Sequence, residues 1–285
     1  MLNFMRIEEP IIELGAWLQS APGRVLLHWE QACLDSAVAD VFGYHALQLG
    51  LPEMDGLRAN RMPHRWVASD SLDVPQTLDM PPPDDARIST LPSGQAVALH
   101  CDFDALPFAN QSLDLVVLPH ALELARDPHL LLREVERVLV PEGRVMIIGV
   151  NPASLWGLRQ RLGHTRRAVG LGRRSPLFLP RAGEFLNYWR LRDWLRLLSF
   201  EIEGGRFGCY RPPYASARWL ERSAWVERLG ERWWPVLGAV YFLGAVKRVR
   251  GMRLVGLVRH EAPKVRAAKA VVSQRHQPET ETLCE

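Results

Sequence analysis

The sequence has few cysteines, and they are scattered. Four occur in 285 residues, at positions 33, 101, 209 and 284, with no Cys-x-x-Cys pair and no histidine at metal-ligand spacing. This pattern argues against a disulfide framework and against a zinc site, and no metal is predicted as a cofactor. A reducing cytoplasm is the predicted compartment.

Long hydrophobic runs are also missing. The longest, WWPVLGAVYFLGAV at residues 233–246, is too short to cross a bilayer and is interpreted as a buried strand with its flank. Arg6, Glu8 and Glu9 interrupt the first apolar residues, so no secretory signal is predicted. We therefore expect no membrane span.

Charge is present but unevenly distributed. Residues 1–150 contain 10 Lys/Arg and 21 Asp/Glu, and residues 151–285 contain 25 and 11, so the net charge of +3 conceals halves of −11 and +14. A basic half suits nucleic acid, an anionic membrane surface or an acidic substrate, and attraction between the two halves accounts for the same pattern. No basic run is dense enough to predict an RNA-binding module, so nucleic acid is not the favoured partner. The sequence gives no sign of the oligomeric state.

Strand patterns alternate with helix patterns along the chain. Apolar residues at helical spacing predict helices over 28–42, 128–140 and 191–200. Apolar runs predict strands over 44–51, 64–71, 94–102, 113–120, 141–152, 200–208 and 239–249. The alternation predicts an α/β fold: a Rossmann-like doubly wound, three-layer α/β/α sandwich around a seven-stranded, mostly parallel sheet.

Composition suggests the domain organisation. Residues 28–262 are predicted to form one domain, which follows an N-terminal extension over 1–27 and precedes a polar, disordered tail over 263–285. Two Arg-rich segments, at about 153–190 and 210–236, are interpreted as insertions that lie over the strand ends as a lid. The first of them is predicted to be irregular.

The segment DFDALPFANQSLDLVVLPHALE, followed by DPHLLLREVERVLVPEGRVMIIGVNP, carries a recognisable pattern. It has an acidic residue after the third strand, then Leu-Pro-Phe, a short polar turn, and an Asp before an apolar strand. This resembles the second half of a class I S-adenosylmethionine (SAM)-dependent methyltransferase, and more narrowly the type 11 methyltransferase domain. The resemblance covers residues 44–151 at motif level, and it implies SAM as the cofactor and methyl transfer to an acceptor, expected to be a small molecule.

The resemblance also implies which residues contact the cofactor. Asp102 matches the acid that accepts a hydrogen bond from the adenine amino group, and Phe103 falls beside the adenine ring. Leu118 and Pro119, continuing to His120, match the ledge under the methionine part. These residues follow predicted strands, where ligands bind in doubly wound sheets.

The loop after the first strand departs from the family. The family has an acidic residue, an apolar residue and then Gly-x-Gly-x-Gly, and here Gln48, Leu49 and Gly50 stand at the first three positions. Leu51 adds bulk where glycine would be bare, and Pro52 removes a backbone donor. The pattern predicts an impaired loop that still bends at Gly50 and hydrogen-bonds through Gln48.

Three polar residues carry both a functional and a structural interpretation. Asp70 matches the acid that binds the ribose hydroxyls, and an Asp at a strand end is also a common turn former. His120 is a weak candidate for a general base near the methyl group, but without a second catalytic partner we favour a polar cap on the next helix. Asp114 is interpreted as structural.

The leading hypothesis is an enzyme, a SAM-dependent methyltransferase acting on an unidentified acceptor. The alternative is a catalytically silent binding or regulatory module with the same fold, contacting RNA through its basic half. A nicotinamide-dependent dehydrogenase is disfavoured because GxGxxG is missing. A retained cofactor pocket would favour the enzyme, and a pocket filled by Leu51 or Met54 would favour the silent module.

Overall fold

In the computed structural model, the described residues are 14–249 except 16, 71–98, 169–177 and 180–184. Within them, seven strands form one sheet in the order β3-β2-β1-β4-β5-β7-β6. The strands are β1 (His45–Leu49), β2 (His64–Asp70), β3 (Leu99–Cys101), β4 (Leu113–Pro119), β5 (Leu139–Val150), β6 (Phe200–Gly208) and β7 (Val240–Lys247). Strands β1 to β5 pair in parallel, whereas β7 is antiparallel to both β5 and β6. The predicted mostly parallel sheet is confirmed.

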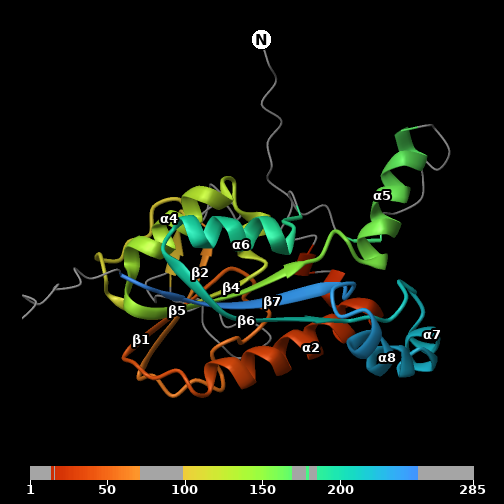
Figure 1. The fold of residues 1–285 in the computed structure, drawn as a ribbon, viewed down its shortest axis with the longest axis horizontal. Coiled ribbons are helices and arrows are strands. Elements are labelled where there is room, and N and C mark those ends of the chain that lie inside the picture. The colour runs from red at the N-terminus through yellow and green to blue at the C-terminus, as the bar shows by residue number, and fades with distance from the viewer. Residues whose placement is uncertain (1–13, 16, 71–98, 169–177, 180–184, 250–285) are drawn as a thin grey trace, which may run out of the picture. The chain divides into compact units, whose positions relative to one another are not determined.

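Helices cover both faces of this sheet (Figure 1). Helices α4 (Pro128–Val138) and α6 (Tyr188–Leu197) contribute to the core on one face, and α2 (Ala21–Val38) contributes to the core on the other. The remaining described helices are α3 (Ala121–Leu124), α5 (Leu155–Ala168), α7 (Ala217–Arg222) and α8 (Trp225–Trp233). The structure is the predicted Rossmann-like, three-layer α/β/α sandwich.

The central strand β4 shows why its sequence is apolar without interruption. Val116 and Leu118 point into the core beneath α4 and α6, while Leu115 and Val117 point into the core beneath α2. Successive side chains of a strand alternate between faces, so a sheet covered on both sides needs apolar residues at every position. All four are fully buried, and truncation of Leu115 or Leu118 to alanine costs about 2–5 kcal/mol.

Helix α2 begins earlier and ends earlier than the helix predicted over 28–42. Its start is set by Ser20, whose hydroxyl accepts a hydrogen bond from the Gly23 N–H at 3.3 Å, and by a proline in the first turn. It ends at Val38. The last seven residues of the segment predicted as an N-terminal extension therefore lie in this helix.

Asp114 anchors the start of β1, which confirms its structural interpretation. Its carboxylate accepts hydrogen bonds from the backbone N–H groups of Tyr44 and His45 at 2.8 and 2.9 Å. Gly43 allows this approach, since a Cβ there would lie only 2.4 Å from the Asp114 Cβ.

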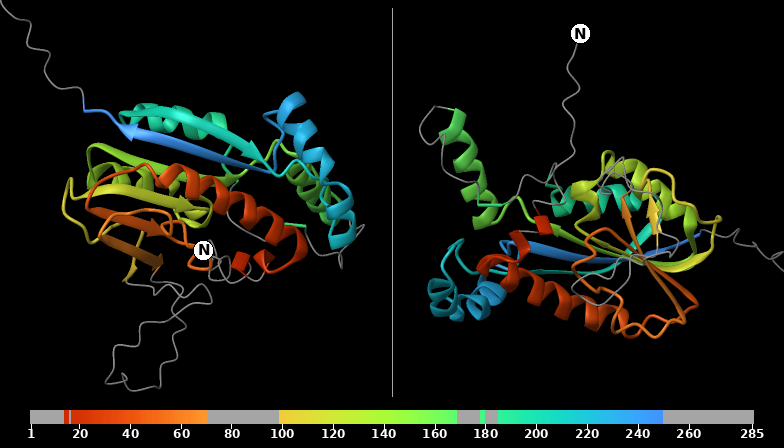
Figure 2. Two further views of the ribbon diagram at one scale, coloured as in Figure 1. Left: turned by 90° about the horizontal axis from the view of Figure 1, so that it is seen from below. Right: turned by 180° about the vertical axis from the view of Figure 1, so that it is seen from behind.

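Helices α5, α7 and α8, which belong to the two Arg-rich segments, lie at the carboxyl edge of the sheet. Helix α5 follows the end of β5, and α7 and α8 connect the end of β6 to the start of β7. Figure 2 shows these three helices gathered at one end of the sheet in both views. The prediction of irregular structure over 153–190 is wrong for the part that forms α5. None of the helices in the described part of the chain has the length and apolar content that a membrane crossing needs.

Candidate functional site

The strand register brings the predicted cofactor-contacting positions to one edge. Asp70 is the last residue of β2, Asp102 follows β3, and Pro119 is the last residue of β4. Gly50 follows β1 and continues the ladder by donating its N–H to the Ala68 carbonyl at 2.8 Å. Strands β1 and β4 are neighbours at the point where the strand order reverses, which is where doubly wound sheets bind ligands.

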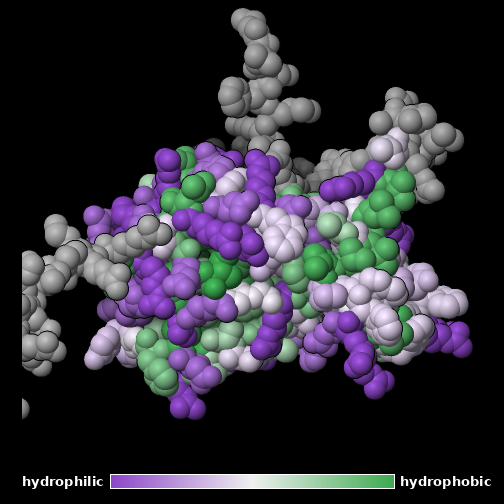
Figure 3. Space-filling model, viewed as in Figure 1, coloured by the Kyte–Doolittle hydropathy of each residue, from purple (hydrophilic) through white to green (hydrophobic). Residues whose placement is uncertain are grey.

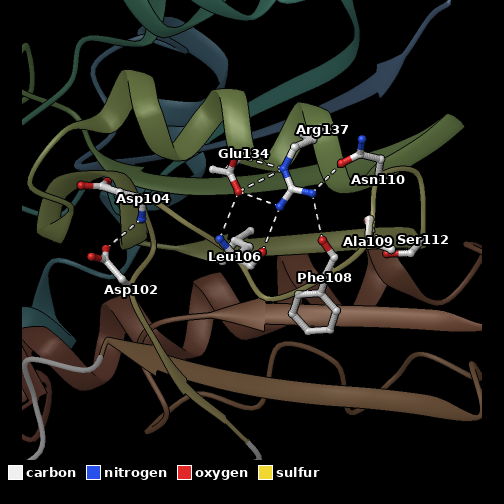
Figure 4. Close-up of polar contacts among 9 residues, drawn as sticks. All are labelled: Asp102, Asp104, Leu106, Phe108, Ala109, Asn110, Ser112, Glu134 and Arg137. Atoms are coloured by element: carbon white, nitrogen blue, oxygen red, sulfur yellow. Dashed lines mark hydrogen bonds and ion pairs between the residues drawn. The ribbon is translucent and has the colours of Figure 1, made fainter.

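Carboxylates concentrate at this edge. The Asp102 side chain is exposed and accepts a hydrogen bond from the Asp104 N–H at 3.0 Å (Figure 4), while Asp70 is buried. Burial, together with the negative charges of Asp70 and Asp102, raises the pKa of the Cys101 thiol to about 11. Carboxylate oxygens accept hydrogen bonds from hydroxyl and amino groups, the donors that the ribose and adenine of SAM present. The residues at this edge therefore fit the adenosyl half of the cofactor.

Helix α4 holds the Leu-Pro-Phe loop that follows Asp102 (Figure 4). Glu134 accepts a hydrogen bond from the Leu106 N–H at 3.0 Å. Arg137 donates to the carbonyl oxygens of Leu106 and Phe108, both at 2.9 Å, and to the Asn110 side chain at 2.7 Å. An ion pair of 2.8 Å joins Arg137 to Glu134. One polar pair thus fixes both the path of the loop and its distance from α4.

The loop after β1 is organised around the buried side chain of Gln48. Its Nε2 donates to the carbonyl oxygens of Gly50, Leu51 and Met54, at 3.2, 3.1 and 2.7 Å. Its Oε1 accepts a hydrogen bond from the Gly56 N–H at 2.9 Å. The predicted hydrogen bonding through Gln48 is observed, but these bonds hold the loop itself. A carboxylate could not donate to those three carbonyls.

The chain bends at Gly50 as predicted, with φ of +77°, and Leu51 also has a positive φ of +41°. Leu51 and Met54 are buried in the core on the α2 side of the sheet. Gly50 faces Phe103 and Ala121, which belong to the core on the other side of the sheet. A Cβ added to Gly50 would lie 3.8 Å from the Phe103 ring and 3.6 Å from the Ala121 Cβ. The two apolar loop residues therefore lie in a different core from the groups that face Gly50.

His120 does not cap helix α3 through its side chain, which corrects the sequence interpretation. It occupies the N-cap position with a left-handed φ of 54°, but its side chain makes no capping bond. Its Nε2 lies 2.9 Å from a carboxylate oxygen of Glu30 on α2, and its Nδ1 lies 2.9 Å from one of Glu123 on α3. All three side chains are almost completely buried.

The charge of this cluster is set by competition between burial and pairing. Burial alone would lower the pKa of His120, but the carboxylates of Glu30 and Glu123 outweigh it and raise the pKa to about 10. Burial raises the pKa of Glu30, and His120 opposes that change. The raised pKa favours the protonated imidazole, in which both ring nitrogens carry a hydrogen and neither has a lone pair free to accept a proton. The cluster instead ties α2 to the turn between β4 and α3.

Sequence reasoning missed Glu30 and Glu123. Glu30 is the one charged residue among the buried positions of α2, where its neighbours include Leu26, Cys33 and Leu34. A charge on an apolar helix face is a signal of a buried partner. Its partner, however, is 90 residues away in the sequence, so the signal does not say which residue it is.

A cavity of about 560 Å³ lies between α2 and the chain that follows β6. Its lining is largely apolar, with Val25 and Trp29 from α2 and Leu220 from α7. Arg24 and Arg211 also line it, together with the carboxylates of Glu221 and Glu227. Within the described residues, no cluster of His, Cys, Asp and Glu has the arrangement of a metal site.

Residues 78–147 match the sequence model of a methyltransferase domain family. The predicted family resemblance is confirmed. An uncharacterised Escherichia coli K12 protein, YafS, is 28% identical over 194 residues, which are 68% of this chain and 73% of that protein. The demethylmenaquinone methyltransferase of Chlamydia pneumoniae is 37% identical over 62 residues, which are 22% of this chain and 27% of that enzyme.

Solved structures also match the chain, at low sequence identity. A SAM-dependent methyltransferase from Thermotoga maritima is 14% identical to this chain. The match covers 78% of this chain and 92% of that one, with a TM-score of 0.47. The strand order and the antiparallel β7 are observed directly in this structure and establish its fold without that comparison.

Proposed function

We propose that the chain is a SAM-dependent methyltransferase that acts on a small-molecule acceptor. The observation that carries the proposal is that the Gly50 bend, Asp70 and Asp102 lie at the carboxyl ends of the adjacent strands β1, β2 and β3, beside the switch point of the sheet. The matched methyltransferase domain and the Chlamydia pneumoniae relative support methyl transfer as the chemistry. The buried, unpaired thiols of the described cysteines support a cytoplasmic location.

Each group at the edge has a proposed part in binding. SAM supplies a methyl group that its positively charged sulfur has already activated. Asp102 would accept a hydrogen bond from the adenine amino group, and Asp70 would accept hydrogen bonds from the ribose hydroxyls. Phe103 would lie beside the adenine ring. Gly50 and the preceding Leu49 would pass close to the methionine part, which also rests on the ledge of Leu118 and Pro119. The chain's remaining task is to hold the acceptor in line with the methyl group and to exclude water.

The Glu30–His120–Glu123 cluster has a positioning role in this proposal. It fixes the turn that carries Ala121, whose Cβ faces Gly50. The cavity between α2 and α7 is our candidate for the acceptor, because it lies beside the inserted helices and offers apolar walls with a few charged groups of both signs.

Asp102→Ala should weaken SAM binding without unfolding the protein, because the carboxylate is exposed and its one described bond is to Asp104. Isothermal titration calorimetry with SAM and S-adenosylhomocysteine should give micromolar binding, about −8 kcal/mol, for the original chain. We expect about a tenfold loss in the variant, the value of one hydrogen bond to a charged group. Asp193→Ala, at an exposed position of α6, is the matched control and should bind normally. Folded protein that gives no heat with either ligand would contradict the enzyme.

Arg137→Met should also weaken SAM binding, through the loop that it holds. The variant loses hydrogen bonds to two backbone carbonyls and to Asn110, and we expect a loss of about 1–3 kcal/mol in the free energy of unfolding. Arg133→Met changes an exposed arginine on the same helix and should leave both quantities unchanged. Calorimetry and urea denaturation would measure them, and equal behaviour of the two variants would argue against this role of Arg137.

The second candidate function is the catalytically silent module, with RNA contacted by the basic half. One observation favours it: the described hydrogen bonds of Gln48 all hold its own loop. Under this alternative, neither SAM nor S-adenosylhomocysteine binds, whereas RNA does, in a salt-dependent way. The calorimetric experiment with Asp102 therefore separates the two functions.

A further inference from the structure

Helix α8 carries its large apolar side chains on the side that faces away from the domain. Trp225, Leu229 and Trp233 follow one another at a spacing of four residues and are 40–68% exposed. The inward side of the helix is formed by Gly230, where a Cβ would lie 2.3 Å from the Tyr210 ring. Surface helices of soluble domains have the opposite arrangement, with the apolar stripe facing the core.

Large apolar side chains are also exposed on the neighbouring helices. We call the whole set the edge patch, and it consists of Leu158 and Leu162 of α5, Trp219 of α7, and Trp225, Leu229 and Trp233 of α8. The Trp156 indole N–H, at the base of α5, donates to the Arg211 carbonyl at 2.7 Å and so holds α5 beside the chain that leads to α7. Figure 3 shows hydrophobic side chains along α5 and hydrophilic ones extending around α7 and α8.

Arginines surround the edge patch. The exposed ones on its helices are Arg159, Arg161, Arg218, Arg222, Arg228 and Arg232. The acidic residues of α7 and α8 are fewer, and one of them, Glu227, turns inward to accept the Cys209 N–H at 2.7 Å. The exposed arginines outnumber the exposed carboxylates, Glu221 and Glu231, so these helices combine positive charge with exposed apolar side chains, as helices in the interface of an anionic membrane do.

We propose that the edge patch docks on the surface of an anionic lipid bilayer. The indole of tryptophan is amphipathic, with an apolar ring and a polar N–H, so the tryptophans suit the headgroup level of the bilayer. The leucines would enter the boundary of the acyl chains below it. The arginines contact lipid phosphates. RNA would use the arginines and the rings but not the exposed leucines, and a second copy of the chain would bring like charges together. The bilayer is the partner that uses all three kinds of side chain.

Docking would be measured by co-sedimentation of the full chain with lipid vesicles. We expect binding to phosphatidylcholine vesicles that contain about 30% phosphatidylglycerol, and little binding to phosphatidylcholine alone. Trp225→Ala combined with Trp233→Ala should weaken this binding about tenfold. Phe42→Ala is the matched control, because Phe42 is an even more exposed aromatic residue, at 77%, just before β1 at the opposite edge of the sheet. It should bind as the original chain does.

Three outcomes would overturn the proposal. The first is failure of the original chain to bind vesicles of either composition. The second is equal binding by the double tryptophan variant, or loss of binding in Phe42→Ala, since the edge patch would then not be the contact. The third is a monomer–dimer change, by analytical ultracentrifugation, that follows the tryptophan substitutions while vesicles are not bound, which would assign the surface to a second copy. None of these readouts requires SAM binding, so the proposed function and the docking surface are tested separately.

Discussion

His120→Leu should lower the free energy of unfolding by about 3–5 kcal/mol, the cost of breaking a buried ion pair by removing one partner. The substitution removes the cation between Glu30 and Glu123 and leaves two buried carboxylates without it. Urea denaturation at about pH 7 would measure the change. His100→Leu replaces an exposed histidine on β3 and is the matched control, expected to cost little.

Glu30→Gln should cost much less than His120→Leu, because His120 keeps its ion pair with Glu123. The substitution keeps a hydrogen-bonding side chain of the same size, and Glu30 already has a raised pKa and one carboxylate oxygen without a hydrogen-bond partner among the described residues. Because the substitution keeps the size of the side chain, a cost equal to that for His120→Leu would show that the negative charge of Glu30, and not packing, is what stabilises the cluster.

The same cluster predicts how stability depends on pH. The pKa of His120 is about 10 in the folded chain and 6.5 as its ordinary value, so the folded state binds more protons between these values. The stabilisation is complete below pH 6.5 and is lost as the pH rises toward 10. We expect unfolding free energies to fall from pH 6.5 to about pH 8.5 in the original chain and to change less in His120→Leu. This window ends before the Cys33 thiol, whose pKa burial raises to about 11, contributes strongly.

The sheet and the helices α2, α4 and α6 that pack on it could be predicted because each follows a simple hydrophobic periodicity. β4 is apolar on both faces, β6 matches its predicted bounds, and α4 has its apolar stripe on the side that packs. Helix α8 obeys the helical period too, but its apolar side faces solvent, so a search for a stripe that packs on the core does not identify it. The cluster around His120 could not be predicted, because a pair 90 residues apart leaves no local pattern.

The loop after β1 is the place where the family pattern and this structure make opposite predictions. The family has an acid where Gln48 stands, so the resemblance implies that Gln48→Glu would be tolerated or would restore the usual contact. In this structure the side-chain amide donates to the carbonyls of Gly50, Leu51 and Met54. A carboxylate would face those three oxygens with no proton to offer, inside a buried site.

Gln48→Glu should therefore lower the free energy of unfolding by about 3–5 kcal/mol near neutral pH, as for other uncompensated buried charges, and weaken SAM binding. Burial and the facing carbonyls favour the protonated carboxyl group, so its pKa should rise and the defect should lessen as the pH is lowered toward about 5. Gln19→Glu makes the same change at an exposed position before α2 and should have little effect at either pH. Urea denaturation and calorimetry with SAM would measure both quantities. A Gln48→Glu protein that is as stable as the original and binds SAM more tightly would show that the loop adopts the family's arrangement once the acid is present, and that the bonds of Gln48 compete with cofactor binding.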